Sequence, residues 1–274
     1  MRGLAVGQVV KSNKPNFDVG DLVLGVFGWQ DYIATDGGGL ANMRKVFPGL
    51  PPTLALSLFG LTGATAYFGV NDLGRCKPGE TFVVSAAAGA VGSVAGQIAK
   101  IKGCRVIGIT GGKAKVEWVL REAGFDGAID HRSEDVGARL SELCPNGIDV
   151  YFDNVGGPIL DEVLKRISLH ARVVLCGSIS QYNSKESYGL KNTSNLVLRR
   201  GRMEGFLIFD YEERYPEALQ ALFGWWQEGR LKQKEDIAYG LENAPKAFIR
   251  LFTGDNFGKQ ILKIADPPEP VAPA

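Results

Sequence analysis

The chain has 274 residues, 45% of them hydrophobic, and its 31 basic and 30 acidic residues nearly balance. This length accommodates two domains, and the balanced charge argues against a nucleic-acid binder, since the cluster Arg199-Arg200-Gly201-Arg202 is better interpreted as a solvated turn entering a strand. No apolar run reaches the length of a membrane span and Met1-Arg2-Gly3 opens no signal peptide, so we expect a cytoplasmic protein without a membrane partner.

The most informative stretch is a strand, a turn of small residues and a helix. Residues 81–85 are apolar and β-prone, and a helix over 93–102 ends at Gly103. Such an arrangement brings backbone N–H groups and a helix N-terminus together, which within a βαβ unit indicates a dinucleotide site. The usual G-x-G-x-x-G pattern is only partly present, because its three positions hold Ala87, Gly89 and Gly92.

The end of the next strand, residues 105–110, indicates which dinucleotide binds. A site for NAD carries a carboxylate there, which binds the ribose 2′-hydroxyl. This chain instead has Gly111-Gly112 followed by Lys113 and Lys115, and its first acidic residue, Glu117, lies inside the next helix. Lysines attract a 2′-phosphate that a carboxylate would repel, so the sequence predicts NADP(H).

Alternating helices and strands continue to about residue 176 and predict a doubly wound parallel sheet. Strands are expected at 127–130, 148–152 and 171–176. A helix is expected at 113–123, and two more are marked by apolar positions, the first by Val136, Leu140 and Leu143 and the second by Leu160, Val163, Leu164 and Ile167. Ligands bind beyond the carboxyl ends of such strands. This rule selects one rim, which consists of the small-residue turn, 110–115, 130–131, 154–157 and 176–183.

The C-terminal part reads as a smaller α/β piece. Helices are expected at 215–229 and 243–253, with 238–241 leading into the second, and a strand at 259–264. The tail 266–274 is rich in proline and is expected to be disordered.

Cysteine and histidine usage predicts neither a metal site nor a hydrolytic triad. The four cysteines (Cys76, Cys104, Cys144 and Cys176) form no C-x-x-C pair. His131 and His170 stand alone, without an acidic and serine constellation.

The chain resembles the zinc-independent medium-chain dehydrogenase/reductases, specifically the group of prostaglandin reductases, alkenal double-bond reductases and curcumin reductase. The resemblance covers nearly all of residues 1–264. Its motifs are GDLVLGVFGWQDY (20–32), LTGATAYFG (61–69), AAAGAVGSVAGQIAKIKGCRVIG (86–108), YFDNVGG (151–157), LCGSISQYN (175–183), RMEGF (202–206), GLENAPKAF (240–248) and GDNFGK (254–259).

The resemblance implies a role for each matching residue. The pyrophosphate would lie on Gly89, Ala90, Val91 and Gly92. The 2′-phosphate would meet Lys115, and His131 stands near it where relatives often carry tyrosine. The remaining coenzyme contacts would come from Asn154, Cys176, Gly177, Ser178, Ile179, Tyr182, Phe206, Leu207, Ile208 and Asn256. Tyr182 is also the candidate proton donor. Two alternatives remain open, because Asn154 could simply cap its turn and Tyr182 could form only a pocket wall.

The resemblance also implies a domain organisation. Residues 63–205 would form the Rossmann domain, and 1–62 with 206–265 would form a GroES-like β-rich catalytic domain whose first strands are missing, because Met1 aligns well inside that domain. An incomplete gene model is the favoured explanation over a natural short form, since a partial barrel exposes strand edges.

The implied activity is NADPH-dependent reduction of the C=C bond of an α,β-unsaturated aldehyde or ketone by a homodimer. The alternatives are a quinone reductase on the same fold and a non-catalytic NADPH-binding protein, with a zinc alcohol dehydrogenase least favoured.

Overall fold

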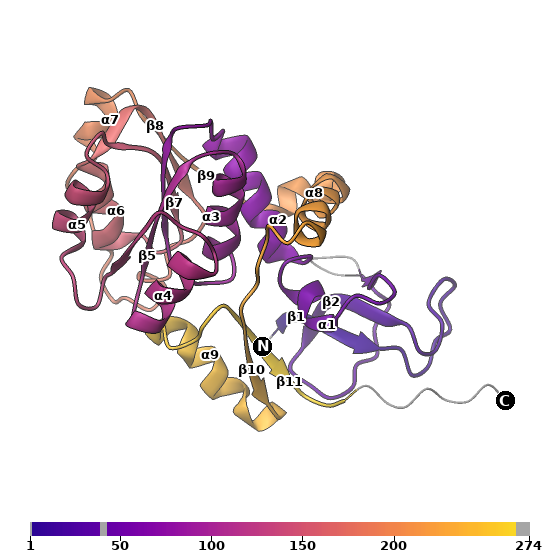
Figure 1. Ribbon diagram of the computed structural model, residues 1–274. Coiled ribbons are helices and arrows are strands. Elements are labelled where there is room, and N and C mark those ends of the chain that lie inside the picture. The colour runs from indigo at the N-terminus through magenta and orange to yellow at the C-terminus, as the bar shows by residue number, and fades with distance from the viewer. Residues whose placement is uncertain (1, 39–42, 267–274) are drawn as a thin grey trace.

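A six-stranded parallel sheet forms the centre of the computed structural model, which describes residues 2–38 and 43–266. Its strand order is β6-β5-β4-β7-β8-β9, and helices cover both faces (Figure 1). The strands are β4 (Thr81–Ser85), β5 (Arg105–Thr110), β6 (Gly127–Asp130), β7 (Ile148–Asp153), β8 (Ile167–Leu175) and β9 (Arg202–Gly205). The connecting helices are α3 (Gly92–Ile101), α4 (Lys113–Arg121), α5 (Val136–Leu143), α6 (Gly157–Leu164) and α7 (Ser194–Leu198). The doubly wound prediction is confirmed.

Alternation along the buried strands creates two cores, one on each face of the sheet. On β4, Phe82 and Val84 join a cluster with α3 and α4, whereas Val83 between them joins a cluster with α5 and α6. The amphipathic helices contribute Val94, Ile98 and Val119 to the first cluster and Leu140, Leu160, Val163 and Leu164 to the second. Both faces of the sheet are therefore buried under helices, and the sheet fixes the positions of the loops at its carboxyl edge.

A group of helical segments, formed within residues 52–74 and 208–227, lies beside this sheet. Helix α1 (Pro52–Leu56) precedes α2 (Leu61–Phe68), which continues into the π-helical segment η1 (Gly69–Gly74). Helix α8 (Tyr215–Gln227), which follows the 3-10 segment η2 (Ile208–Arg214), packs on α2 (Figure 1). Leu222 of α8 belongs to the same apolar cluster as Phe82 and Val84. The boundaries of the Rossmann domain remain a prediction.

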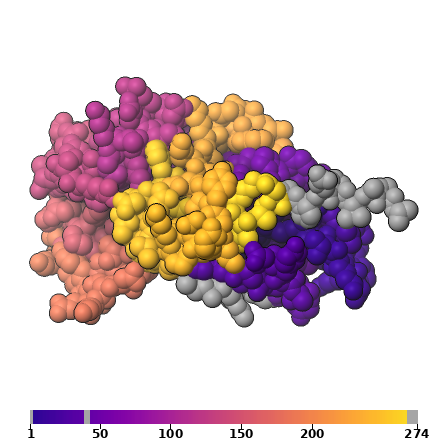
Figure 2. Space-filling view, turned by 90° about the horizontal axis from the view of Figure 1, so that it is seen from below, coloured from indigo at the N-terminus to yellow at the C-terminus, as the bar shows by residue number. Residues whose placement is uncertain are grey.

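Two small sheets complete the fold. Strands β1 (Arg2–Gln8), β2 (Leu22–Gly28) and β3 (Arg44–Lys45) are antiparallel. Strands β10 (Glu235–Tyr239) and β11 (Lys259–Lys263) are parallel and are connected through the 3-10 turn η3 (Leu241–Asn243) and α9 (Ala244–Thr253). Figure 2 shows this C-terminal unit lying between the N-terminal strands and the large sheet.

Three details differ from the sequence prediction or fall outside it. Ile167 was assigned to a helix, but it begins β8 and pairs with Ile148, because an apolar residue suits a buried strand as well as a helix face. Strand β10 was not predicted beyond a lead-in at 238–241. The predicted disorder of the tail concerns residues 267–274, which lie outside the described part of the chain, while Asp266 forms an ion pair with Lys263.

Within the described ranges, no helix combines the length and the apolar character needed to cross a membrane.

Candidate functional site

The turn between β4 and α3 is built by close backbone approach. Ala86 adopts a left-handed conformation with φ of 49°. A Cβ on Gly92 would lie 2.4 Å from the carbonyl oxygen of Ala86, and one on Gly89 would lie 3.0 Å from the same atom. Gly92 must therefore lack a side chain for α3 to start directly behind the strand. A helix N-terminus at such a turn is suited to binding phosphate, and that role stays a prediction for this turn. Ala90 and Val91 lie between these two glycines.

The loop between α9 and β11, near the C-terminal end of the described chain, is hydrogen-bonded to this turn. The N–H of Gly258 donates to the Ala88 carbonyl at 2.9 Å, and Gly258 forms a parallel bridge with Gly89. The amide of Asn256 donates to the Gly258 carbonyl at 3.0 Å. Phe257 packs edge-on against Trp118 of α4, with ring centroids 5.9 Å apart. Asn256 thus lies beside the turn between β4 and α3, and its expected contact with the nicotinamide half stays a prediction.

Basic side chains gather where β5 and β6 end. The Nζ of Lys115 donates to the Gly254 carbonyl at 2.8 Å, and burial followed by the charge of Arg132 lowers the pKa of Lys115. His131 lies against Gly111, since a Cβ there would come within 2.8 Å of its Nε2, and burial lowers its pKa. Arg132 completes the group. Arg132 was not among the predicted site residues, although it directly follows His131 at the predicted carboxyl rim of the sheet.

The end of β7 is organised by a buried carboxylate that sequence analysis also overlooked. Oδ1 of Asp153 accepts from Ser85 Oγ at 2.9 Å, from Tyr151 OH at 2.8 Å, and from the N–H groups of Val155 and Gly156 at 3.0 Å each. Asp153, rather than Asn154, therefore caps the turn. Asn154 spans the two strands, because its amide donates to the Ser85 carbonyl at 2.8 Å.

The loop after β8 lies against this turn. A Cβ on Gly156 would be 3.0 Å from Cβ of Ser178, and the N–H of Ile179 donates to the Asn154 carbonyl at 3.2 Å. Burial, aided by Asp153, raises the pKa of the Cys176 thiol to about 12. Tyr182 folds back over Gly177, and its hydroxyl accepts from the N–H of Ser178 at 3.2 Å. Its side chain remains accessible, with 60% of the residue exposed.

The segment after β9 leaves the same carboxyl edge of the sheet, because β9 is parallel to β8. Phe206 packs against Tyr211 with ring centroids 6.2 Å apart, whereas Leu207 is 65% exposed. The carbonyl of Ile208 accepts from Tyr215 OH at 3.1 Å. The coenzyme contacts assigned to these three residues remain predictions, as do the roles of the other site residues.

Across residues 2–38 and 43–266, no group of three or more His, Cys, Asp or Glu side chains is arranged to hold a metal ion.

Asp153→Asn is expected to lower the free energy of unfolding by about 1–3 kcal/mol, the range for losing hydrogen bonds to a buried charged group. Four donors face Oδ1, and only a charged acceptor compensates all of them. Urea unfolding followed by circular dichroism measures the change. Tyr151→Phe is the matched control, because it removes one donor and keeps the carboxylate, so it should cost less. An equal or larger loss for Tyr151→Phe would contradict this assignment.

The sequence matches two families, the one described as "Zinc-binding dehydrogenase" over residues 90–224 and the one described as "N-terminal domain of oxidoreductase" over residues 1–43. It is 42% identical to the NADP(+)-dependent 2-alkenal reductase of Nicotiana tabacum over 96% of this chain and 77% of that protein. It is 41% identical to the NADPH-dependent curcumin reductase of Escherichia coli over 97% of this chain and 78% of that protein.

A solved structure agrees with these matches. The crystal structure of CurA from Vibrio vulnificus in complex with NADPH superposes with a TM-score of 0.92 at 44% identity, over 97% of this chain and 80% of that chain. With both the sequence and the fold shared over most of their lengths, the chain belongs to the medium-chain dehydrogenase/reductase family of oxidoreductases, in the group of the alkenal and curcumin reductases.

Proposed function

We propose that this protein uses NADPH to reduce the C=C bond of α,β-unsaturated aldehydes or ketones. The observation that carries the proposal is the pairing of a phosphate-binding turn on β4 with basic side chains at the end of β5, where an NAD site has a carboxylate. The names of the tobacco and Escherichia coli relatives support the substrate class.

The residues present fit the cofactor. A Cβ on Gly92 would lie 2.4 Å from the Ala86 carbonyl oxygen, so only glycine lets α3 begin directly behind β4, where its N-terminus would face a pyrophosphate. Lys115 and Arg132 supply positive charge at the neighbouring strand end. Gly89, Ala90, Val91 and Gly92 would hold the pyrophosphate. Asn154, Phe206 to Ile208 and Asn256 would contact the nicotinamide half, and the loop from Cys176 to Tyr182 would line the coenzyme.

When bound, NADPH supplies a hydride for the β-carbon of the substrate. The chain then has two tasks, which are to hydrogen-bond the enolate oxygen and to deliver a proton to the α-carbon. Tyr182 is the candidate for both, since the residue is 60% exposed and its hydroxyl is positioned by the N–H of Ser178, in the loop that contacts Asn154. Water is the alternative proton source. The segments that surround the rim would shield the reaction from bulk solvent.

The test is consumption of NADPH by the purified chain with a short enal, an arylidene ketone and a quinone, each repeated with NADH. Fast turnover of the enones with NADPH is the expected result. Preferential turnover of the quinone would favour a quinone reductase. Saturable NADPH binding without turnover of any substrate would instead indicate a binding protein, and would overturn the proposed activity.

Tyr182→Phe is expected to lower kcat for the enones by about 100-fold, the lower range for loss of a positioned proton donor. The Kd for NADPH should change little, because the ring remains. Tyr188→Phe is the control, since its hydroxyl binds Asp161 Oδ2 at 3.2 Å in the same loop region. An unchanged kcat for Tyr182→Phe would assign the proton to water and leave Tyr182 as a pocket wall.

We also infer that two copies pair through the β9 edge of the sheet. Strand β9 ends the sheet, and the adjoining helix α7 leaves Val197 and Leu198 exposed at 77% and 66%. An open strand edge beside exposed apolar side chains favours pairing. Sedimentation velocity of the purified chain should therefore give the mass of a dimer, and a monomer at micromolar concentration would contradict the inference.

A further inference from the structure

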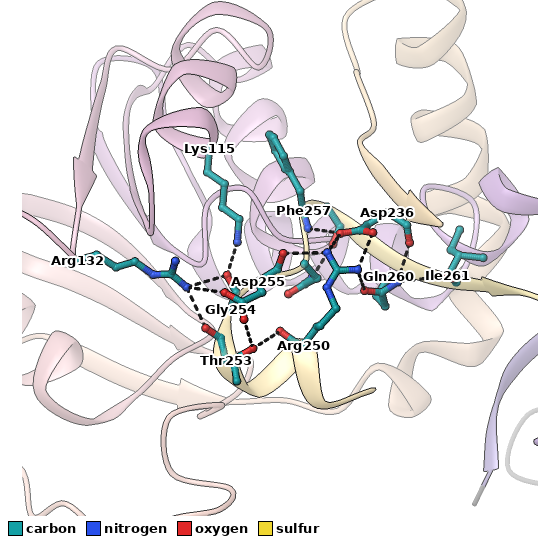
Figure 3. Close-up of polar contacts among 12 residues, drawn as sticks. Lys115, Arg132, Asp236, Arg250, Thr253, Gly254, Asp255, Phe257, Gln260 and Ile261 are labelled. Carbon is teal, nitrogen blue, oxygen red and sulfur yellow. Dashed lines mark hydrogen bonds and ion pairs between the residues drawn. The ribbon is translucent and has the colours of Figure 1, made fainter. Parts of the chain in front are cut away.

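Two basic side chains converge on the C-terminal turn of α9 (Figure 3). Lys115 Nζ donates to the Gly254 carbonyl at 2.8 Å, and Arg132 Nη2 donates to the same oxygen at 3.0 Å and to the Thr253 carbonyl at 2.9 Å. Because both cations reach one oxygen atom, they are close enough for a single phosphate group to contact both. They come from different connections, Lys115 from α4 and Arg132 from the loop after β6.

Arg132 also lies against the glycine turn that follows β5. A Cβ on Gly111 would be 3.0 Å from Arg132 Nε and 2.8 Å from His131 Nε2. In a doubly wound sheet, the end of this second strand faces the adenosine ribose, whose 2′-substituent distinguishes the two nicotinamide cofactors. Arg132 therefore stands at the position where that substituent is recognised.

The acidic groups nearby leave this pair with a weak partner. Asp130 accepts from the backbone N–H groups of Gly112 and Arg132 at 2.8 and 3.0 Å, so its carboxylate holds the loop. Asp255 Oδ1 lies 3.4 Å from Arg132 Nη2, and its Oδ2 accepts from Thr253 Oγ1 at 2.7 Å. The pair is thus held by two neutral carbonyls at a helix C-terminus and by one carboxylate 3.4 Å from Arg132, partners that a dianionic phosphate would outcompete.

We propose that Arg132 is a specificity-determining residue that binds the 2′-phosphate of NADPH together with Lys115, and that this phosphate competes with Gly254 and Asp255 for the two cations. The proposal rests on the cofactor assignment above and deepens it. Both cations lie on connections of the large sheet, Lys115 on α4 and Arg132 in the loop after β6, whereas α9 belongs to the C-terminal unit. Cofactor binding and the docking of the α9 turn would therefore use the same donors (Figure 3).

The test is the Kd of NADPH, NADH, 2′,5′-ADP and 5′-AMP, measured by fluorescence and calorimetric titration at fixed ionic strength. Arg132→Gln should raise the Kd of NADPH and 2′,5′-ADP about tenfold or more, as expected for loss of a charge-assisted hydrogen bond. The Kd of NADH and 5′-AMP should stay within about twofold of the wild-type value, because neither ligand carries the 2′-phosphate. Arg132→Lys should recover part of the lost affinity.

Arg121→Gln is the matched control, because it removes the same charge from an exposed side chain of α4 whose partner is Glu117. Asp255→Asn should lower the Kd of NADPH about two- to fivefold without changing that of NADH, since it removes the competing carboxylate. Equal losses for NADPH and NADH in Arg132→Gln would show that Arg132 only docks α9 and would overturn the proposal. An unchanged Kd for 2′,5′-ADP, or wild-type protein that does not prefer NADPH, would overturn it too.

These outcomes are independent of the reductase assay. A chain that prefers NADPH through Arg132 but reduces no enone would contradict the proposed activity and support this inference. A chain that reduces enones equally well with NADH would do the reverse.

Discussion

Close backbone contact at the carboxyl end of β4 constrains the arrangement of the whole site. Helix α3 can begin directly behind the strand only because Gly92 has no side chain to meet the Ala86 carbonyl, 2.4 Å from where a Cβ would lie. The N–H of Gly258, from the C-terminal loop, donates to the Ala88 carbonyl in the same turn. The hydroxyl of Ser85, at the end of the strand before the turn, donates to Asp153. Three connections far apart in the sequence thereby meet at the turn between β4 and α3.

The acidic and basic side chains around that turn have different partners. Asp153 is buried and fully engaged, so it fixes the loop shape and offers nothing to a ligand. Lys115 and Arg132 instead donate to carbonyls of the α9 C-terminus, neutral partners that the 2′-phosphate would replace under our proposal. A buried carboxylate thus fixes the shape of one loop, while two cations are the groups proposed to bind the cofactor.

Local patterns account for the parts that were predicted correctly. The strand, glycine turn and helix at 81–101 follow from sequence periodicity and small residues, and the alternating order of elements predicted the parallel sheet. Ile167 was misplaced because an apolar residue fits either a helix face or a buried strand. Strand β10 was missed because its Asp236 reads as solvent-exposed, whereas its carboxylate pairs with Arg250 at 2.6 Å.

The sequence by itself determined the family, the doubly wound sheet and the preference for a phosphorylated dinucleotide, because each depends on residues close together in the chain. Only the tertiary structure placed Arg132 beside Gly111 and brought the 253–258 loop onto the turn at 86–92. The contacts of the 253–258 loop join segments more than a hundred residues apart. Arg132 and Gly111 are nearer in the chain but belong to different connections of the sheet, so their contact depends on how the strands pair. Sequence periodicity carries no record of that geometry.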